Sequence, residues 1–339
     1  MEALRLALAL LATVTPTGAA DPIAGILGGF EQARVVALGE THGHDEFHQL
    51  VIRLLEDPRA QALIDDVAVE WGNALYQGVI DRYLDGGAVP WDSVTMAWRN
   101  TVVSPGLVWD APVYQRFFEA IRRINTGLPT ERRYRVILAD SPVDWSRVTS
   151  RDDLQPFGDR ALAMADNVRR LSLLRGRRAL FLAGGLHVHR QPRTFPTRDG
   201  IPRGEIPSVA WIELKHPGTV YVIQSMARAV DLEVEALIGS GPPRLVTMAE
   251  SPALAALDAD RVHTLRNADG TKPRVYRDLR LGDLVDAVIL WDRSALHYPE
   301  PDPATYRVDW YWQELERRSR LLRGRPMDPA LREPSDGGP

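Results

Sequence analysis

The sequence predicts an α/β protein with a mostly parallel central sheet flanked by helices. Short apolar runs alternate along the chain with amphipathic helical patterns, which is typical of strands joined by helical crossovers. Two of these runs, 35–38 and 179–183, each lead directly into the motif Gly-x-x-His. The composition, with 45% hydrophobic and 25% charged residues in 339 positions, is that of an ordinary globular protein.

The elements follow from the spacing of the apolar residues. A short helix at 21–32 precedes the first strand at 34–38. A helix is expected at 44–55, with a brief continuation at 60–64 beyond Pro58. Further strands are expected at 66–70, 134–139, 178–183, 219–224, 244–248 and 284–291. Further helices are expected at 75–84, 113–124, 154–174 and 306–322, while 208–214 fits either a helix or a strand.

No linker divides the chain, so we predict one α/β domain over 21–326. We interpret 88–130 as a helical insertion or lid, because its first part is irregular and rich in tryptophan. The segment 190–206 is rich in Pro, Gly and Arg and is expected to be a mobile loop beside the site. Several Pro and Gly residues predict a disordered tail at 327–339.

The N-terminus resembles a cleavable signal peptide over residues 1–20. The stretch 4–14 is apolar, and small residues at Gly18 and Ala20 fit a cleavage site before Asp21. We therefore expect an exported protein, periplasmic or secreted, and the alternative is a buried first helix. The stretch is too short to span a bilayer, and no later segment reaches about 18 unbroken apolar residues, so no membrane span is expected.

Composition and missing motifs exclude several classes of protein. The net charge of −4 gives no reason to expect a nucleic-acid partner. The chain has no cysteine, which excludes disulfides, thiolate ligands, a cysteine nucleophile and a lipid-modified N-terminal cysteine. The sequence contains no Gly-x-Ser-x-Gly elbow, no His-Glu-x-x-His, no P-loop and no dinucleotide fingerprint.

The residues best placed for chemistry follow three of the predicted strands. His42 and His187 each lie in a Gly-x-x-His motif just beyond a strand, and Glu70 ends a third strand. Open α/β sheets collect their ligands at this carboxyl edge. Glu40 lies two residues before His42, where a carboxylate can orient the imidazole and raise its basicity. We therefore predict Glu40, His42, Glu70 and His187 as catalytic residues.

Other polar residues near these motifs are candidates for substrate binding. Asp140 also ends a strand, although it fits equally well an Asp turn before a Ser-Pro pair. His189 and Arg190 continue the second motif as His-x-His-Arg, and in an extended chain His189 would face the same way as the histidine two residues earlier. His44 and His48 share one helical face near the first motif. We assign His44, Asp140, His189 and Arg190 to substrate binding.

These motifs together resemble the erythromycin esterase–ChaN–Tiki–TraB superfamily. The resemblance is carried by Leu-Gly-Glu-Thr-His-Gly at 38–43, by Val-Ala-Val-Glu at 67–70, and by the second Gly-x-x-His at 184–187. The late strand Asp-Ala-Val-Ile at 286–289 is similar to the strand that closes those proteins. The likeness spans roughly residues 33–292, and the spacing Gly-x-x-His is closer to ChaN and Tiki than to the esterases.

The resemblance implies an α/β fold with its site at the strand ends. In the esterases the residue matching His42 is a general base that activates water without a required metal, and residues matching Glu40, Glu70 and His187 line the cleft. In Tiki-like members the two histidines and the glutamate support metal-dependent peptide cleavage, which here implies a divalent metal on His42, Glu70 and His187. ChaN-like members bind haem or iron.

Three hypotheses about function remain open from the sequence. The first is an exported hydrolase of an ester, lactone or amide bond, acting on a small-molecule or peptide substrate. In it His42 takes a proton from water, Glu40 or Glu70 orients the imidazole, and His187 and Arg190 stabilise the oxyanion. The second is a ChaN-like periplasmic haem or iron carrier without catalysis. The third is a protein that keeps the fold without activity.

Overall fold

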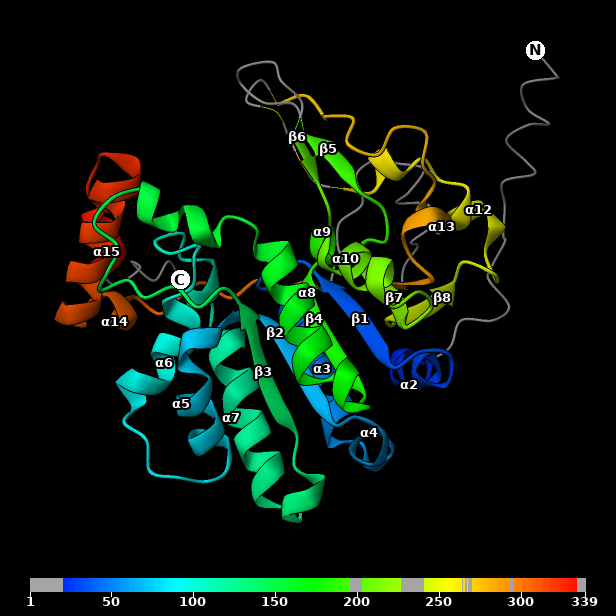
Figure 1. Cartoon of the computed structure of the whole chain (residues 1–339), viewed down its shortest axis with the longest axis horizontal. Helices are drawn as coiled ribbons and strands as arrows, with labels where there is room; N and C mark the ends of the chain where they lie inside the picture. Colours follow the sequence, from blue (N-terminus) through cyan, green and yellow to red (C-terminus); the bar gives the residue numbers. More distant parts are fainter. Residues whose placement is uncertain are drawn as a thin grey trace.

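The apolar runs of the sequence form one seven-stranded sheet in the computed structural model, which describes residues 21–195, 203–226, 241–263, 265, 267, 270–292 and 296–333 (Figure 1). The strands are β1 (Val35–Glu40), β2 (Asp66–Asn73), β3 (Arg135–Asp140), β4 (Ala179–Gly184), β7 (Val220–Met226), β8 (Arg244–Thr247) and β9 (Ala287–Leu290). They lie in the order β3-β2-β4-β1-β7-β9-β8, and every neighbouring pair is parallel except β8 with β9. The predicted α/β fold with a mostly parallel sheet is confirmed.

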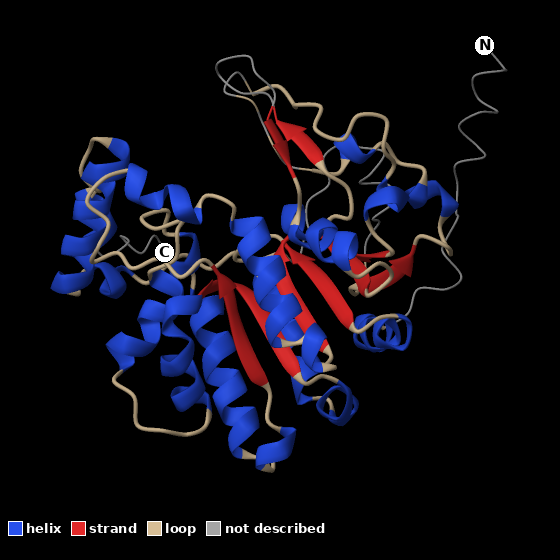
Figure 2. Cartoon of the chain, viewed as in Figure 1, coloured by secondary structure: helices blue, strands red, loops and turns tan. Residues whose placement is uncertain are grey.

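Both faces of the sheet are buried against helices, as Figure 2 shows. Successive side chains of a strand point to opposite faces, so Val36 and Leu38 enter one core and Val35 and Ala37 enter the other. The first core is covered by α2 (Pro22–Gln32), α3 (Asp45–Glu56), α4 (Pro58–Leu63), α5 (Gln77–Leu84), α6 (Trp91–Arg99) and α7 (Pro112–Thr126). The second is covered by α8 (Arg160–Leu171), α9 (Gly185–Val188), α10 (Ser208–Lys215), α12 (Pro252–Ala255) and α13 (Leu281–Leu284).

Short elements complete the framework between these helices and strands. The ambiguous segment 208–214 is helical, and the segment 190–206 contains a two-stranded antiparallel sheet. Its strands are β5 (Arg193–Phe195) and β6 (Arg203–Glu205). The 3-10 turns are η1 (Ala74–Tyr76), η2 (Val108–Asp110), η3 (Thr130–Arg132), η4 (Asp152–Phe157), η5 (Leu173–Arg175), η6 (Ala259–Arg261) and η8 (Pro329–Arg332).

Two helical predictions differ from the structure. The expected helix at 154–174 is divided into η4, α8 and η5, because Pro156 removes a backbone donor and α8 starts anew after the N-cap Asp159. The segment 88–130, expected as an insertion or lid, contains α7, which packs directly on the sheet. Phe117 of α7 meets the Trp71 ring of β2 with the ring centres 5.4 Å apart. This helix therefore belongs to the layer that covers the first core.

The C-terminal residues form a small helical unit beside α6, at the upper left of Figure 1. It consists of α14 (Pro303–Tyr306), α15 (Asp309–Arg323) and η8. Met327, at the start of the predicted disordered tail, is only 5% exposed and packs with Tyr306 and Leu315. The prediction of disorder is therefore wrong for 327–333, because this apolar side chain anchors the segment; residues 334–339 lie outside the described part.

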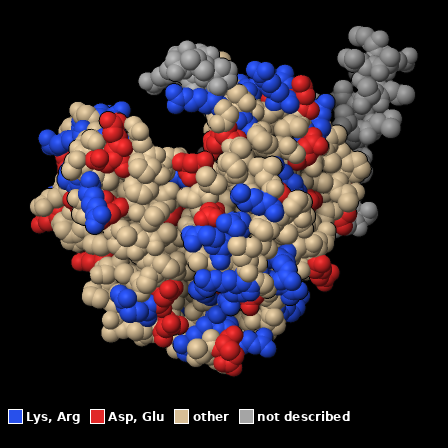
Figure 3. All heavy atoms as spheres, in the orientation of Figure 1, with Lys and Arg blue, Asp and Glu red and all other residues tan. Residues whose placement is uncertain are grey.

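Charged side chains of both signs lie in separate patches on the face of the molecule in Figure 3, among other residues. The basic ones gather over its lower part with acidic ones between them. Arg135 and Arg177 both pair with the buried Asp66, at 3.0 and 2.8 Å.

Within the described residues no helix has both the length and the apolar character needed to cross a membrane. The predicted signal peptide at 1–20 lies outside the described residues.

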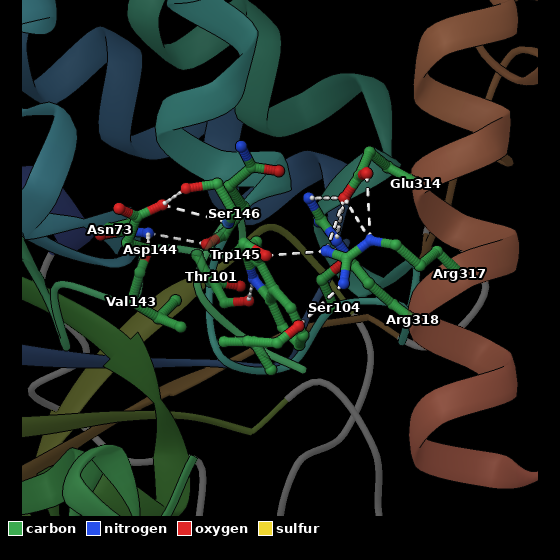
Figure 4. A network of polar contacts seen from close by, with 12 residues as sticks. Asn73, Thr101, Ser104, Val143, Asp144, Trp145, Ser146, Glu314, Arg317 and Arg318 are labelled. Atoms are coloured by element: carbon green, nitrogen blue, oxygen red, sulfur yellow. Dashed lines mark hydrogen bonds and ion pairs between the residues drawn. The ribbon is translucent and has the colours of Figure 1, made fainter. Parts of the chain in front are cut away.

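Two arginines attach helix α15 to the body of the protein, and a glutamate of the same helix holds their guanidinium groups (Figure 4). The Arg318 guanidinium lies 4.6 Å from the centre of the Trp145 ring, and its Nη1 donates to Ser104 Oγ at 2.9 Å. Arg317 donates to the Trp145 carbonyl oxygen at 2.8 Å. Glu314 Oε2 accepts from both arginines, at 2.9 and 3.2 Å. These contacts join the last long helix to the loop that follows β3, which holds Trp145, and to the loop that follows α6, which holds Ser104.

We predict that Arg318→Met lowers the free energy of unfolding by about 2–4 kcal/mol, because it leaves buried partners without their donor. Arg318 is only 1% exposed. Arg320→Met on the same helix is the matched control: its side chain is 68% exposed and pairs with Glu316, so a loss below about 1 kcal/mol is expected. Urea unfolding of both variants measures the difference. Equal losses in the two variants would contradict this account of how α15 is attached.

Candidate functional site

Three neighbouring strands bring the predicted residues to one edge of the sheet. β4 lies between β1 and β2, and because all three are parallel their carboxyl ends meet. Glu40 ends β1, Glu70 is the first residue of β2 beyond its pairing with β4, and Gly184 ends β4. His42 follows β1, and His187 lies in α9, directly after β4. The structure thus brings His42, Glu70 and His187 together, as the strand-end motifs predict.

Glu40 is buried and holds two histidines. Its Oε1 atom lies 2.7 Å from His42 Nδ1 and accepts a hydrogen bond from Tyr114 Oη at 3.2 Å. Its Oε2 atom lies 2.8 Å from His48 Nε2. Burial alone would raise the pKa of Glu40, but the hydrogen bonds from His42 and His48 outweigh it and lower the pKa to about 2. An ionised carboxylate only accepts, so both imidazole nitrogens facing it carry protons.

His42 is therefore held with its other nitrogen available for chemistry. Because Nδ1 donates to Glu40, a neutral His42 carries its lone pair on Nε2. The ring stands edge-on to Trp109, with the ring centres 4.8 Å apart, and the side chain is 37% exposed. Burial lowers the pKa of His42, but its hydrogen bond to Glu40 and the negative charge of Glu70 raise the pKa overall to about 9. The two carboxylates make this imidazole unusually basic.

Glu70 is the second buried carboxylate of the site. The backbone N–H of Gly184 donates to its Oε2 at 2.6 Å, and Arg160 Nη2 donates to its Oε1 at 3.1 Å. His187 Nε2 lies 3.4 Å from the same Oε1. Burial would raise the pKa of Glu70, but the charges of His187, His42 and Arg160 hold it well below its usual range. Glu70 is therefore an ionised group that lies between Arg160, His187 and the catalytic candidate His42.

Asp140 lies behind this cluster and binds it only through Arg160. Arg160 Nη2 and Nε donate to the Asp140 carboxylate at 2.9 and 3.0 Å. Asp140 is fully buried, which raises its pKa against the opposing charge of Arg160. The expected substrate-binding residue thus orients Arg160, which bridges Asp140 and Glu70.

Gly184 is required where the two motifs approach each other. A Cβ atom at this position would lie 2.7 Å from His42 Cε1, 3.0 Å from His42 Nε2 and 3.2 Å from Glu70 Oε2. Gly184 also pairs in register with Glu40 across β4 and β1. The glycine of the second Gly-x-x-His motif therefore makes room for the histidine of the first.

A cleft of about 610 Å³ opens over His42. One wall comes from the chain around η2, including Leu107, Val108 and Ala111. The facing wall comes from the C-terminal part of the chain, with Tyr298, Pro299, Glu300, Pro301, Pro303, Tyr306, Ala330, Leu331 and Glu333. Most of these side chains are apolar, so the cleft suits a substrate with a large apolar portion.

His44 is buried in an aromatic setting and is not among the cleft residues. Its ring stacks on Tyr298 and stands edge-on to Trp291, and its Nε2 lies 3.1 Å from Glu46 Oε2. Burial lowers the pKa of His44 to about 4. The predicted substrate-binding histidine is therefore an uncharged core residue, one turn before His48, which does reach the site.

His189 and Arg190 point away from the cluster, contrary to the prediction. Residues 185–188 form the helical turn α9, so the side chains do not alternate as they would in an extended chain. His189 is buried against the Tyr276 hydroxyl, and burial lowers its pKa to about 3. Arg190 donates to the carbonyl oxygen of Val220, the first residue of β7, and to Asp286. Both residues serve the structure of the second core.

The predicted metal ligands do not fit a metal ion. Within the described ranges, no group of three or more His, Asp or Glu side chains is arranged to hold one. Both oxygens of Glu70 already accept hydrogen bonds, and one of them comes from the guanidinium of Arg160. The Arg160 guanidinium therefore already lies beside the Glu70 oxygen that would have to bind a metal ion, and its positive charge would repel that ion. The set His42, Glu70 and His187 is therefore better described as a histidine–carboxylate cluster.

Sequence reasoning missed three residues of the site. Tyr114 lies within the amphipathic helix α7, Arg160 begins α8, and Trp109 belongs to η2. None of them lies near either Gly-x-x-His motif, so no local pattern marks them. His48 could be found, because it shares a helical face with His44 four residues earlier.

The sheet order and the histidine–carboxylate cluster define an α/β protein with its site at the carboxyl edge of a parallel sheet. No protein-family model matches the sequence, and the comparison with curated proteins finds no match. Among solved structures the chain is similar to a Bacillus cereus protein, with a TM-score of 0.58, 12% identity, and coverage of 86% of this chain and 95% of the other.

Two further structures share this fold. A histidine-to-asparagine mutant of the erythromycin esterase EreC in its open conformation gives a TM-score of 0.54 at 12% identity, covering 82% of this chain and 94% of the other. A succinoglycan biosynthesis protein gives 0.51 at 12% identity, covering 83% and 93%. The chain therefore has the erythromycin-esterase-like fold, and the resemblance expected from its motifs is confirmed at the level of the fold.

Proposed function

We propose that this protein is a hydrolase that cleaves an ester, lactone or amide bond with His42 as its general base. The observation that carries the proposal is the Glu40–His42 pair. A buried, ionised carboxylate holds His42 Nδ1 at 2.7 Å, which leaves Nε2 to accept a proton from water beside an apolar cleft. The fold shared with an erythromycin esterase agrees with this class of reaction.

The chemistry uses water as the nucleophile. His42 Nε2 takes a proton as the water oxygen attacks the carbonyl carbon, and the resulting imidazolium returns a proton to the leaving alcohol or amine. Glu40 and Glu70 stabilise this imidazolium, because both carry negative charge close to the ring. General-base help of this kind contributes roughly 10² to 10⁴ in rate.

The developing oxyanion needs a cationic or donor group on the other side of the carbonyl. Arg190, which the sequence favours for this role, binds the start of β7 instead. We assign the role to His187, whose side chain is 15% exposed and lies beside Glu70. Arg160 keeps Glu70 in place and completes the positive side of the cluster.

We predict that His42→Gln lowers kcat/KM on a panel of apolar esters, lactones and amides by about 10² to 10⁴. His216→Gln is the control, because His216 only caps the end of α10. The assays are run with and without a chelator, and unchanged activity in the chelator is expected. Full turnover in the His42 variant would overturn the proposal.

A haem titration of the same protein tests the alternative that it is a haem carrier, for which a shift of the haem Soret band is the diagnostic result.

We further predict that activity rises with pH up to about 9. The general base must be neutral, and the pKa of His42 is raised to about 9, so the free protein is mostly protonated at pH 7. At pH 7, kcat/KM should therefore be roughly a hundredfold below its alkaline plateau. Glu40→Gln removes one stabilising charge, so it should move this rise to lower pH while lowering the plateau. A profile that is flat between pH 6 and 9 would exclude His42 as the base.

Export remains part of the proposal and rests on the apolar stretch 4–14 and the small residues before Asp21. Intact-mass measurement of the protein recovered from the periplasm or medium is the test. A mature chain that begins at Asp21 is expected, and a full-length chain retained in the cytoplasm would contradict it.

A further inference from the structure

We propose that His48 is a positioning residue, which orients and tunes His42 through the carboxylate that the two histidines share. The effect on turnover rests on the proposed function, whereas the effect on His42 itself does not. His48 lies on α3, outside both Gly-x-x-His motifs, and is separated from His42 by Glu40.

The hydrogen-bond pattern shows what His48 contributes. Its side chain is only 1% exposed, and Nε2 lies 2.8 Å from Glu40 Oε2. Since Glu40 is ionised, Nε2 must donate the hydrogen bond. The other nitrogen, Nδ1, is buried and has no hydrogen-bond partner among the residues that the structure describes. A proton on Nδ1 would leave a buried donor unsatisfied, so the structure assigns His48 the neutral form protonated on Nε2.

Packing fixes this imidazole in a single orientation. Ring centres of Trp71, Tyr114 and Phe47 lie 5.3, 5.1 and 5.5 Å from the centre of the His48 ring. Tyr114 also reaches Glu40 Oε1, and its hydroxyl oxygen accepts the N–H of Gly43 at 3.0 Å. The Glu40 carboxylate is therefore held from the loop after β1, from α3 and from α7, and His48 supplies the donor on Oε2.

Removal of that donor has two consequences for His42. Glu40 Oε2 would be a buried anionic atom without its partner, so the carboxylate could rotate and carry His42 away from its productive orientation. Without the His48 donor, the negative charge of Glu40 would also interact more strongly with the protonated form of His42. The other charged or titratable groups that face this pair are Tyr114 on Glu40, Glu70 and Arg160 on His42, and His44 on α3. None of these is changed by a substitution at position 48.

The test compares His48→Phe with His48→Gln. Phenylalanine keeps the ring volume but has no donor, whereas the glutamine amide can reach the place of Nε2. With an ester that the wild-type protein hydrolyses, His48→Phe should lower kcat by about tenfold to a hundredfold with little change in KM, as expected for one hydrogen bond to a charged group. His48→Gln should restore most of this loss. The rise of kcat/KM with pH, which follows deprotonation of His42, should move to higher pH only in His48→Phe.

NMR titration of the His42 imidazole follows the same coupling without any substrate. Its midpoint should rise in His48→Phe and remain near the wild-type value in His48→Gln. Unchanged titration and unchanged kcat in a folded His48→Phe variant would overturn the proposal. If both variants fail to fold, nitrogen-15 NMR of the wild-type protein decides, because a proton on Nδ1 of His48 would overturn the assignment. If the wild-type protein hydrolyses no member of the substrate panel, the proposed function fails, but the NMR test of the coupling between His48 and His42 is unaffected.

Discussion

The burial of the Glu40 charge is the constraint on which the site depends. A carboxylate taken out of water is stable only if several donors replace the lost hydration. Here three side chains do so, and they come from the loop after β1, from α3 and from α7. The end of the central strand is thereby tied to two helices of the first core. The need to solvate the buried Glu40 charge thus fixes how the loop after β1, α3 and α7 lie relative to one another.

The two carboxylates of the site are satisfied in different ways, and this difference shapes its chemistry. Among the described residues, Glu40 is bound by His42, His48 and Tyr114, whereas Glu70 is bound by the Gly184 amide and the Arg160 guanidinium. Glu70 therefore links Arg160, which also binds Asp140, to His187. His42 lies between the two anions and takes its basicity from both.

The sequence predicts the candidate catalytic residues better than the residues that hold them in place, and the reason is physical. Glu40, His42, Glu70 and His187 are marked because each follows an apolar run, and the parallel sheet brings those ends together. Tyr114 and Arg160 reach the site from helices whose amphipathic pattern reports only the core. His189 and Arg190 were misplaced because the turn at 185–188 is helical, which the run Gly-Leu-His-Val does not reveal. The ordered residues near Met327 were missed because one buried side chain outweighs a polar, proline-rich composition.

In the proposed hydrolase, the reacting groups and the residues that would select the substrate lie in different parts of the molecule. All the acid–base groups stand on strand ends or on helices that cover the sheet, whereas much of the cleft wall comes from residues 298–333. The two parts meet at η2: Trp109 packs against His42, while its neighbour Asp110 accepts a hydrogen bond from Tyr311 of α15 at 2.9 Å. A change in the C-terminal wall can therefore alter which substrate reaches His42 without disturbing the carboxylates that make it basic. If the proposed hydrolase activity holds, the same scaffold can keep that reaction while its cleft is adapted to a different apolar substrate.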